Sequence, residues 1–442
     1  MNLSLTLAFG SLLLCSSLIA AEEKSSGPNV ILIMADDVGI EAFPTYGGES
    51  YATPNLDRMA KEGIQFNHCY SQPLCTPSRV KIMTGRSNVH NYYDFSLLHP
   101  KEKTIGHHMQ SAGYVTGIVG KWQLYGAKHY NKTAEMGMHP SKAGFDTYCL
   151  WQIENLGSRY QDPWIVEDGK RLEGKDKYGP DLFADFALRF IREHKDEPFF
   201  LYYPMVLVHD PFVPTPDSDL KNRSKAGGNR QANFSDMMSY MDKIVGRVWK
   251  EVKTQGIEEN TVIIFVADNG THRSISSSWR GNSVAGGKGM STDAGTHVPL
   301  YAVWPKKIKA GTQTASLVDF ADVLPTVLDI AGAKLPKNSP VTGKSFRSVL
   351  EGNETSIHDS IYVYSNPRPT RKSFPKAVFA RDQHYKLYSD GRFYRVEADR
   401  LEKHNILAGS EDDRPKVRQK LQARLDEMPD DGQLLIDGSV TK

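Results

Sequence analysis

The fold is indicated by one apolar stretch, Val30-Ile31-Leu32-Ile33-Met34, which runs into Ala35-Asp36-Asp37. An unbroken apolar run of this length suits a strand of a parallel sheet that is covered on both faces. A second such run, Val262–Ala267, ends at Asp268-Asn269. Carboxylates after buried strands are costly unless they bind something, and ligands of open α/β sheets lie at the carboxyl ends of strands. Asp36, Asp37, Asp268 and Asn269 offer only oxygen ligands, so the two strand ends predict a hard-cation site, for Ca²⁺ or Mg²⁺ rather than Zn²⁺.

Strands and helices alternate outward from these two runs. Further strands are predicted at Gly113–Val119 and Pro198–Tyr203, and helices at residues 104–112, from Gly179 onward and around Met237–Val248. Alternation of this kind predicts a large, mostly parallel sheet sandwiched by helices.

The hydrophobic pattern of the sequence changes near Ser360. Short alternating runs follow, with a hairpin signal at Ser389-Asp390-Gly391 and a polar helical pattern over residues 415–428. These features predict a smaller antiparallel sheet plus helix. A length of 442 residues accommodates both parts, so we predict an α/β domain over residues 22–355 and a C-terminal subdomain over residues 356–442.

The first residues carry a targeting pattern. An apolar and small-residue run, Leu3–Ala21, precedes the charged Glu22-Glu23-Lys24, which predicts a signal peptide over residues 1–21. We therefore expect a secreted or periplasmic protein. No later stretch is apolar enough to predict an integral membrane segment, and a net charge of +2 gives no sign of a nucleic-acid partner.

The nucleophile is predicted from the motif Cys75-Thr76-Pro77-Ser78-Arg79, which is followed after four residues by Thr84-Gly85. The motif resembles the signature of the type I sulfatases, which are formylglycine-dependent members of the alkaline-phosphatase-like superfamily. The resemblance implies a sulfuric ester hydrolase in which a maturation enzyme oxidises Cys75 to formylglycine (3-oxoalanine). The hydrate of that aldehyde is the family's nucleophile.

Three further segments are similar to those of the same family: Gly120-Lys121-Trp122, His209-Asp210-Pro211 and Gly287-Lys288-Gly289. By this resemblance the metal and Arg79 hold the oxygens of residue 75, while Lys288 binds the sulfate and, with His209, protonates the leaving alcohol. The implied catalytic residues are Cys75, Arg79, Lys121, Gln123 and His209; the implied substrate-binding residues are Lys288, His209 and Lys121; and the implied ligands of Ca²⁺, or less readily Mg²⁺, are Asp36, Asp37, Cys75, Asp268 and Asn269.

The chain departs from the family pattern at two places. Gln123 stands where the family usually has a His that acts as the base in the sulfate-expelling step, and an amide cannot take a proton at neutral pH. Gln123 could still orient the nucleophile. His297 and Asp293-Ala294-Gly295 replace the usual Arg and Glu-Gly-Gly, and we expect these residues to be supports rather than catalytic groups.

The substrate is less well defined by the sequence. Trp279 and Arg280 lie on a Ser/Gly-rich stretch between the metal pair and Lys288, and Tyr92-Tyr93 and the segment Trp122–Tyr130 could add further contacts. An aromatic side chain beside an arginine suits a sugar that carries an anionic group, so we expect a sulfated glycan. An ordinary loop with incidental Trp packing would give the same pattern.

Other interpretations stay open at this stage. A phosphatase or phosphonate hydrolase of the same superfamily is one alternative, although its two-zinc members use several His ligands where this chain has Asp and Asn. A non-catalytic binder of sulfated glycans is another, indicated only by Gln123. Cys69 and Cys149 could form a disulfide in an oxidising compartment or could be two separate buried thiols.

Overall fold

A computed structural model of the protein describes residues 27–126, 136–219, 230–369 and 374–428. The predicted signal peptide, residues 1–21, lies outside the described residues, as do residues 127–130 of the segment Trp122–Tyr130.

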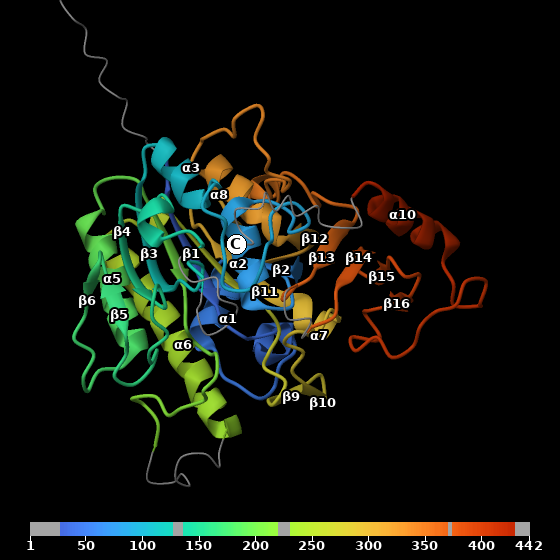
Figure 1. Cartoon of the computed structure of the whole chain (residues 1–442), viewed down its shortest axis with the longest axis horizontal. Coiled ribbons are helices and arrows are strands. Elements are labelled where there is room, and N and C mark those ends of the chain that lie inside the picture. Colours follow the sequence, from blue (N-terminus) through green and yellow to red (C-terminus); the bar gives the residue numbers. More distant parts are fainter. Residues whose placement is uncertain (1–26, 127–135, 220–229, 370–373, 429–442) are drawn as a thin grey trace, which may run out of the picture.

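A sheet of ten strands forms the centre of the molecule (Figure 1). Strand β1 pairs in parallel with β7 and β8, and β3 pairs in parallel with β7 and β4. Strand β11 is antiparallel to both of its neighbours, β2 and β8. In spatial order the strands are β12 (Thr312–Asp319), β2 (Ile64–Tyr70), β11 (His297–Val303), β8 (Thr261–Ala267), β1 (Asn29–Ala35), β7 (Phe199–Pro204), β3 (Val115–Lys121), β4 (Thr147–Trp151), β5 (Ile165–Glu167) and β6 (Lys170–Arg171).

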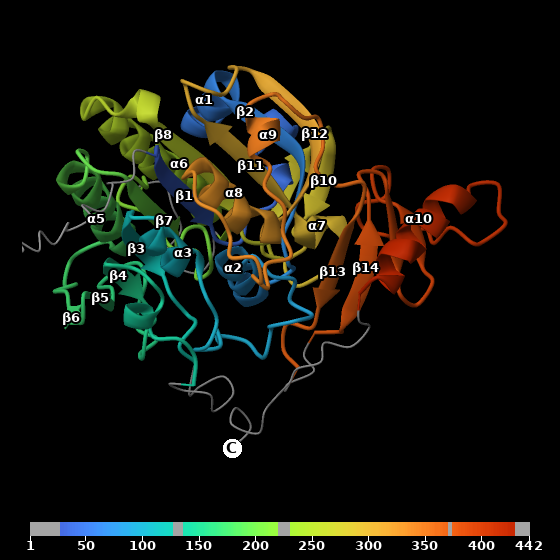
Figure 2. The ribbon, with the colours of Figure 1, turned by 90° about the horizontal axis from the view of Figure 1, so that it is seen from above.

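Helices cover both faces of this sheet (Figure 2). One group consists of α1 (Pro54–Glu62), α5 (Gly179–Glu193) and α6 (Arg230–Thr254), and the other of α2 (Cys75–Thr84), α3 (Ile105–Ser111) and α8 (Val323–Ile330). Every residue of β1 and β8 is buried as a result. The continuous apolar runs therefore lie where the sequence predicts, in the middle of a three-layer sandwich.

A second, four-stranded sheet lies to one side of the molecule in both views (Figures 1 and 2). Its strands are antiparallel, in the order β13 (Ile361–Ser365), β14 (Ala377–Arg381), β15 (Tyr385–Tyr388) and β16 (Phe393–Arg395). Helix α10 (Pro415–Asp426) packs on this sheet through Leu421 and Leu425. The remaining short elements include the hairpin β9 (Ser276–Trp279) and β10 (Asn282–Ala285), and the helices α7 (Asp293–Thr296) and α9 (Arg347–Leu350).

The predicted fold class is confirmed: a large, mostly parallel sheet between helices, plus a small antiparallel sheet with a helix. The antiparallel strand β11 was not predicted, because its residues carry no signal for strand direction. Cys69 and Cys149 are free and buried on β2 and β4, with five strands between them, or roughly 25–30 Å at normal strand spacing. Of the two alternatives for these cysteines, the structure therefore shows separate thiols. Within the described residues, no helix is both long and apolar enough to cross a membrane.

Candidate active site

Two neighbouring strand ends place the acidic residues together. Strands β1 and β8 are in register, with Ala35 opposite Ala267, so Asp36 and Asp268 leave the sheet side by side. Both carboxylates are buried, at 1% exposure. Asp37 adopts a left-handed backbone conformation, with φ of 67°, and its N–H donates to Asp268 Oδ1 at 3.0 Å. A non-glycine residue in this region is strained, and such strain concentrates at functional sites.

Cys75 is the first residue of α2, a helix that is buried along its whole length. Ser78 of the motif fixes this helix to the sheet, because its hydroxyl donates to the backbone oxygen of Asp268 at 2.5 Å. Gly85 ends the helix with φ of 62°, a conformation that favours glycine. The motif thus brings Cys75 Sγ and carboxylate oxygens of Asp36 and Asp268 within 4.8 Å of one another.

Three oxygen atoms in this group are buried and have no hydrogen-bond partner among the described residues: Asp36 Oδ1, Asp268 Oδ2 and Asn269 Oδ1. The Asn269 amide is oriented by its nitrogen, which donates to Asp37 Oδ1 at 2.9 Å and leaves the oxygen available. Buried polar atoms are almost always paired, so unpaired ones call for an explanation. Oxygen-only donors of this kind fit a hard cation such as Ca²⁺.

Two lysines and a histidine surround the carboxylates. Lys121, at the end of β3, pairs with Asp36 at 2.7 Å. Lys288 pairs with Asp37 and also contacts His209 Nε2 at 3.0 Å. Burial disfavours the charged forms of both lysines, but Asp36 and Asp37 outweigh it and raise the pKa values of Lys121 and Lys288. Both side chains therefore stay cationic and suit an anionic substrate.

Burial also sets the pKa values of Asp268 and His209. Burial, with the negative charges of Asp36 and Asp37, raises the pKa of Asp268 well above its usual value. A third carboxylate is thus disfavoured here unless positive charge is added. Burial lowers the pKa of His209 well below its usual value, and nearby Lys288 lowers it further against the opposing effect of Asp37. His209 is therefore neutral near pH 7 and can accept a hydrogen bond from the Lys288 ammonium.

Arg79 and Gln123 complete the set of predicted residues. The buried Arg79 guanidinium donates to the backbone oxygens of Lys121 and Trp122, so it ties the helix of residue 75 to the end of β3. Gln123 also has a left-handed backbone, with φ of 46°, and its Oε1 lies 3.8 Å from Cys75 Sγ. The structure thus gathers every predicted site residue around one point at the carboxyl edge of the sheet.

The residues named for substrate contact have other partners. Tyr92 is buried and donates its hydroxyl hydrogen to the backbone oxygen of Pro367 at 2.7 Å. Trp122 is buried and donates from Nε1 to Met138 O. The Trp279 ring lies against the guanidinium groups of Arg280 and Arg400, at a separate cavity lined by no predicted catalytic or metal residue. These aromatic residues therefore serve packing rather than the site around Cys75.

Sequence reasoning missed two residues beside the site, Arg159 and Tyr160. They lie on the loop between β4 and β5, and the Tyr160 hydroxyl donates to the backbone oxygens of Val206 and His209. The loop carries no motif, so nothing in the sequence marks these residues as neighbours of His209.

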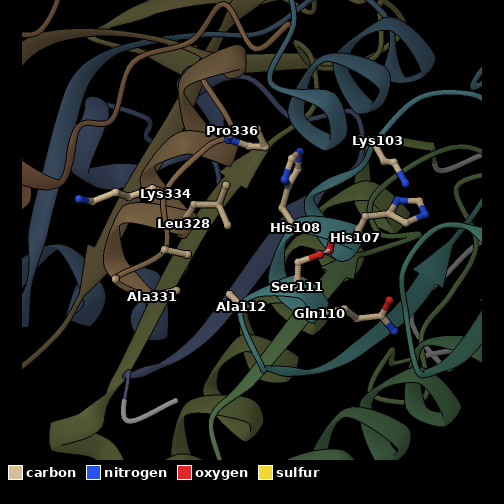
Figure 3. Close-up of a pocket in the computed structure, with 12 residues that line it drawn as sticks. Lys103, His107, His108, Gln110, Ser111, Ala112, Leu328, Ala331, Lys334 and Pro336 are labelled. Carbon is tan, nitrogen blue, oxygen red and sulfur yellow. Dashed lines mark hydrogen bonds between the residues drawn. The ribbon is translucent and has the colours of Figure 1, made fainter. Parts of the chain in front are cut away.

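A cavity of about 700 Å³ lies between α3 and the end of α8 (Figure 3). It is lined by Lys103, His107, His108 and Lys334, among others, and contains none of the predicted site residues. This cavity is therefore separate from the buried charged cluster around Cys75.

Two family models match the chain. One is described as sulfatase and matches residues 28–333, and the other is described as the C-terminal part of N-sulphoglucosamine sulphohydrolase and matches residues 287–431. Both matches include Lys288, and the first includes all the other residues of the site.

Known proteins are similar to the chain in sequence and in structure. An arylsulfatase of Hemicentrotus pulcherrimus is 29% identical over 76% of this chain and 64% of its own length. Human arylsulfatase A is 30% identical over 82% of this chain and 74% of its own length. The crystal structure of Ps i-CgsB in complex with k-i-k-neocarrahexaose is 25% identical, with a TM-score of 0.70 over 86% of this chain and 88% of that one.

Proposed function

The chain belongs to the sulfatase family, and from this premise we propose that it hydrolyses sulfate esters at residue 75. The observation that carries the proposal is the placement of Cys75, at the start of a buried helix and beside three unpaired oxygens and two lysines. Positive charge that is arranged in advance is usually the largest contribution to catalysis on an anionic group.

We propose that a divalent cation, Ca²⁺ in preference to Mg²⁺, binds between Asp36, Asp37, Asp268, Asn269 and residue 75. The unpaired oxygens support this proposal. The raised pKa of Asp268 supports it too, because added positive charge would lower that pKa and favour the carboxylate. Ca²⁺ accepts several carboxylate and amide oxygens in flexible geometry, whereas Mg²⁺ demands an octahedron and retains water. The cation supplies Lewis acidity, and formylglycine made from Cys75 by a maturation enzyme supplies the nucleophilic oxygen.

The remaining roles belong to side chains that are already in place. Lys121 and Lys288 bind the sulfate oxygens, each held by a carboxylate. The Lys288 ammonium donates toward His209 Nε2 at 3.0 Å, so this pair can deliver a proton to the leaving alcohol, with Lys288 as its source. Gln123 orients residue 75 and takes no proton.

We propose a sulfated glycan as the substrate and an extracytoplasmic location. The partly buried Phe374 packs beside Cys75, in a cluster with the buried Phe95, and offers an apolar side chain to a sugar. Arg368 lies 4.4 Å from the Phe95 ring, and Arg273 lies 5.8 Å from the Phe374 ring. The relative that binds the oligosaccharide k-i-k-neocarrahexaose supports this substrate class.

Peptide mapping by mass spectrometry tests the nucleophile. Protein from its native host should carry the aldehyde at residue 75, and Cys75→Ala should abolish turnover of sulfate esters while the fold persists. An unmodified thiol in fully active protein would rule out this nucleophile.

A panel of sulfated mono- and oligosaccharides, with simple aryl sulfates for comparison, tests the substrate class. We expect higher kcat/KM on the saccharides. Turnover of aryl sulfates alone would argue against a glycan, and a converted residue 75 with no turnover on any ester would favour a non-catalytic glycan binder.

A further inference from the structure

We propose that Arg159 binds a second anionic group, sulfate or carboxylate, on the substrate whose sulfate ester is cleaved at residue 75. The inference rests on the proposed function, because it concerns the same site, and it narrows the substrate to glycans that carry at least two anionic groups.

The position of Arg159 is fixed by its neighbours. Its guanidinium lies over the Trp151 ring, 3.9 Å from the ring centroid. Trp151 is the last residue of β4 and pairs in register with Lys121. The next residue, Tyr160, holds the backbone of His209 through its hydroxyl. Arg159 is therefore held between the strand that pairs with Lys121 and the segment that contains His209.

Apart from the Trp151 ring, the guanidinium of Arg159 has no partner in the described part of the chain. Among the described residues it makes no hydrogen bond and no ion pair, although the side chain is half-buried and its Nη1 atom is fully buried. By contrast, the Arg79 guanidinium binds two carbonyl oxygens, and Arg381 binds a carboxylate. A buried N–H group without an acceptor is costly, so an arginine held in this state indicates a ligand.

The chemistry of that ligand follows from the surrounding charges. Arg159 helps to lower the pKa of the Asp36 carboxyl, but that carboxylate already binds Lys121 at 2.7 Å. The charge of Arg159 also acts to lower the pKa values of Lys121, His209 and Tyr160, and none of these neutral or cationic groups can neutralise it. A guanidinium offers two parallel N–H groups that match sulfate and carboxylate oxygens. The ligand is therefore an anion that reaches the site with the substrate.

A neighbouring amide supports a polar subsite on this loop. Gln152 directly follows Trp151, and its backbone oxygen accepts from the N–H of Gln123 at 3.0 Å. Its side chain is buried, and neither Oε1 nor Nε2 has a partner among the described residues. Two residues of one loop thus have unused hydrogen-bonding capacity beside Gln123 and Lys121.

Kinetics on three matched esters test the proposal: a sugar with one sulfate, the same sugar with a second sulfate, and the same sugar with a carboxylate. Wild-type protein should prefer at least one doubly anionic ester. In Arg159→Gln this preference should fall at least about tenfold, mainly through KM, and Arg159→Lys should retain part of it. If the preference for the disulfated ester falls more, the anion is sulfate; if the preference for the carboxylated ester falls more, it is carboxylate.

Arg171→Gln is the matched control, because Arg171 also lies on a tryptophan, 3.7 Å from the Trp164 ring, but is exposed on β6. Its preference among the three esters should equal that of wild type. An unchanged preference in Arg159→Gln, or equal losses on all three esters, would overturn the proposal.

Calorimetric binding in the Cys75→Ala background separates this inference from the proposed function. Tighter binding of the doubly anionic sugar, lost in Arg159→Gln, supports the subsite even if no ester is hydrolysed. Equal binding of the singly and doubly anionic sugars by both proteins would contradict it, whatever the wild type hydrolyses.

Discussion

Two buried clusters of charged residues lie in this molecule, and they differ in how fully their atoms are paired. The site cluster consists of Asp36, Asp37, Lys121, Asp268, Asn269 and Lys288. The junction cluster links the end of the large sheet to the small sheet and consists of Asp293, His297, Arg381, Lys386 and Glu402.

The junction cluster is complete by itself. Arg381 binds Asp293, whose other oxygen faces His297 at 3.3 Å, and Lys386 binds Glu402 at 2.8 Å. Arg381 and Lys386 are fully buried, and no buried side-chain polar atom of these five residues lacks a partner among the described residues. The site cluster leaves three oxygens unpaired. A paired buried network stabilises structure, whereas an unpaired one marks a place where a ligand binds.

The largest effect should come from Asp268→Asn, which keeps the side-chain volume and removes one charge. We expect kcat/KM to fall about 10²–10³-fold or more, because the residue bears one of the unpaired oxygens. The melting temperature in EDTA should not fall, because the raised pKa of Asp268 means that its carboxylate is disfavoured in the folded protein. A large loss of stability in EDTA would mean that Asp268 stabilises the fold, as the residues of the junction cluster do.

Arg381→Gln should have the opposite result. Removal of the guanidinium leaves Asp293 buried without its ion pair, so the free energy of unfolding should fall by about 3–5 kcal/mol in urea titrations. The rate per folded molecule should stay near that of wild type.

Arg392→Gln is the control for this change, because Arg392 pairs with Asp390 at 2.9 Å but both side chains are about half exposed. Its loss should stay below about 1 kcal/mol. Loss of activity in Arg381→Gln without loss of stability would mean that the junction cluster takes part in catalysis.

The sequence predicted the site cluster better than the junction cluster, for a physical reason. Asp36 and Asp268 follow apolar runs, and parallel strands bring their carboxyl ends to one edge, so their proximity follows from local pattern alone. Asp293 begins helix α7 and Arg381 ends strand β14, 88 residues further along the chain, so only tertiary packing joins them. The replacement of Glu by Asp at position 293 is visible in the sequence, but its ion pair is not.

The loops were the least predictable part. Trp279 carried the right chemistry for a sugar contact, yet its Nε1 donates to the backbone oxygen of Tyr46 and its ring lies against two arginines. Arg159 carried no motif and lies beside the site. Composition therefore ranks loop residues poorly, because the path of a loop decides which side chains reach a site.

Cation binding should also distinguish the site cluster from the junction cluster, through a smaller change in stability. Addition of Ca²⁺ to EDTA-treated protein should raise the free energy of unfolding by ~2.7 kcal/mol at a hundred times the dissociation constant. The gain should vanish in Asp268→Asn and persist in Arg381→Gln. Thermal denaturation with Ca²⁺ and with Mg²⁺ measures both the gain and the preference between the ions. An equal gain in both variants would mean that the cation binds elsewhere.

The smallest effect concerns Gln123, a neutral side chain that follows β3 and lies against residue 75. Its Oε1 lies 3.8 Å from Cys75 Sγ, close enough to orient a group there but unable to accept a proton. Gln123→Ala should lower kcat about tenfold through lost orientation, a change of about 1.4 kcal/mol. Gln123→His adds a base with a usual pKa near 6.5, and histidine tolerates the left-handed backbone better than most residues. We expect its kcat to rise across pH 6–7 in a limb that wild type lacks. An unchanged pH profile, with activity retained, would mean that another group already serves as the base and that position 123 only holds residue 75.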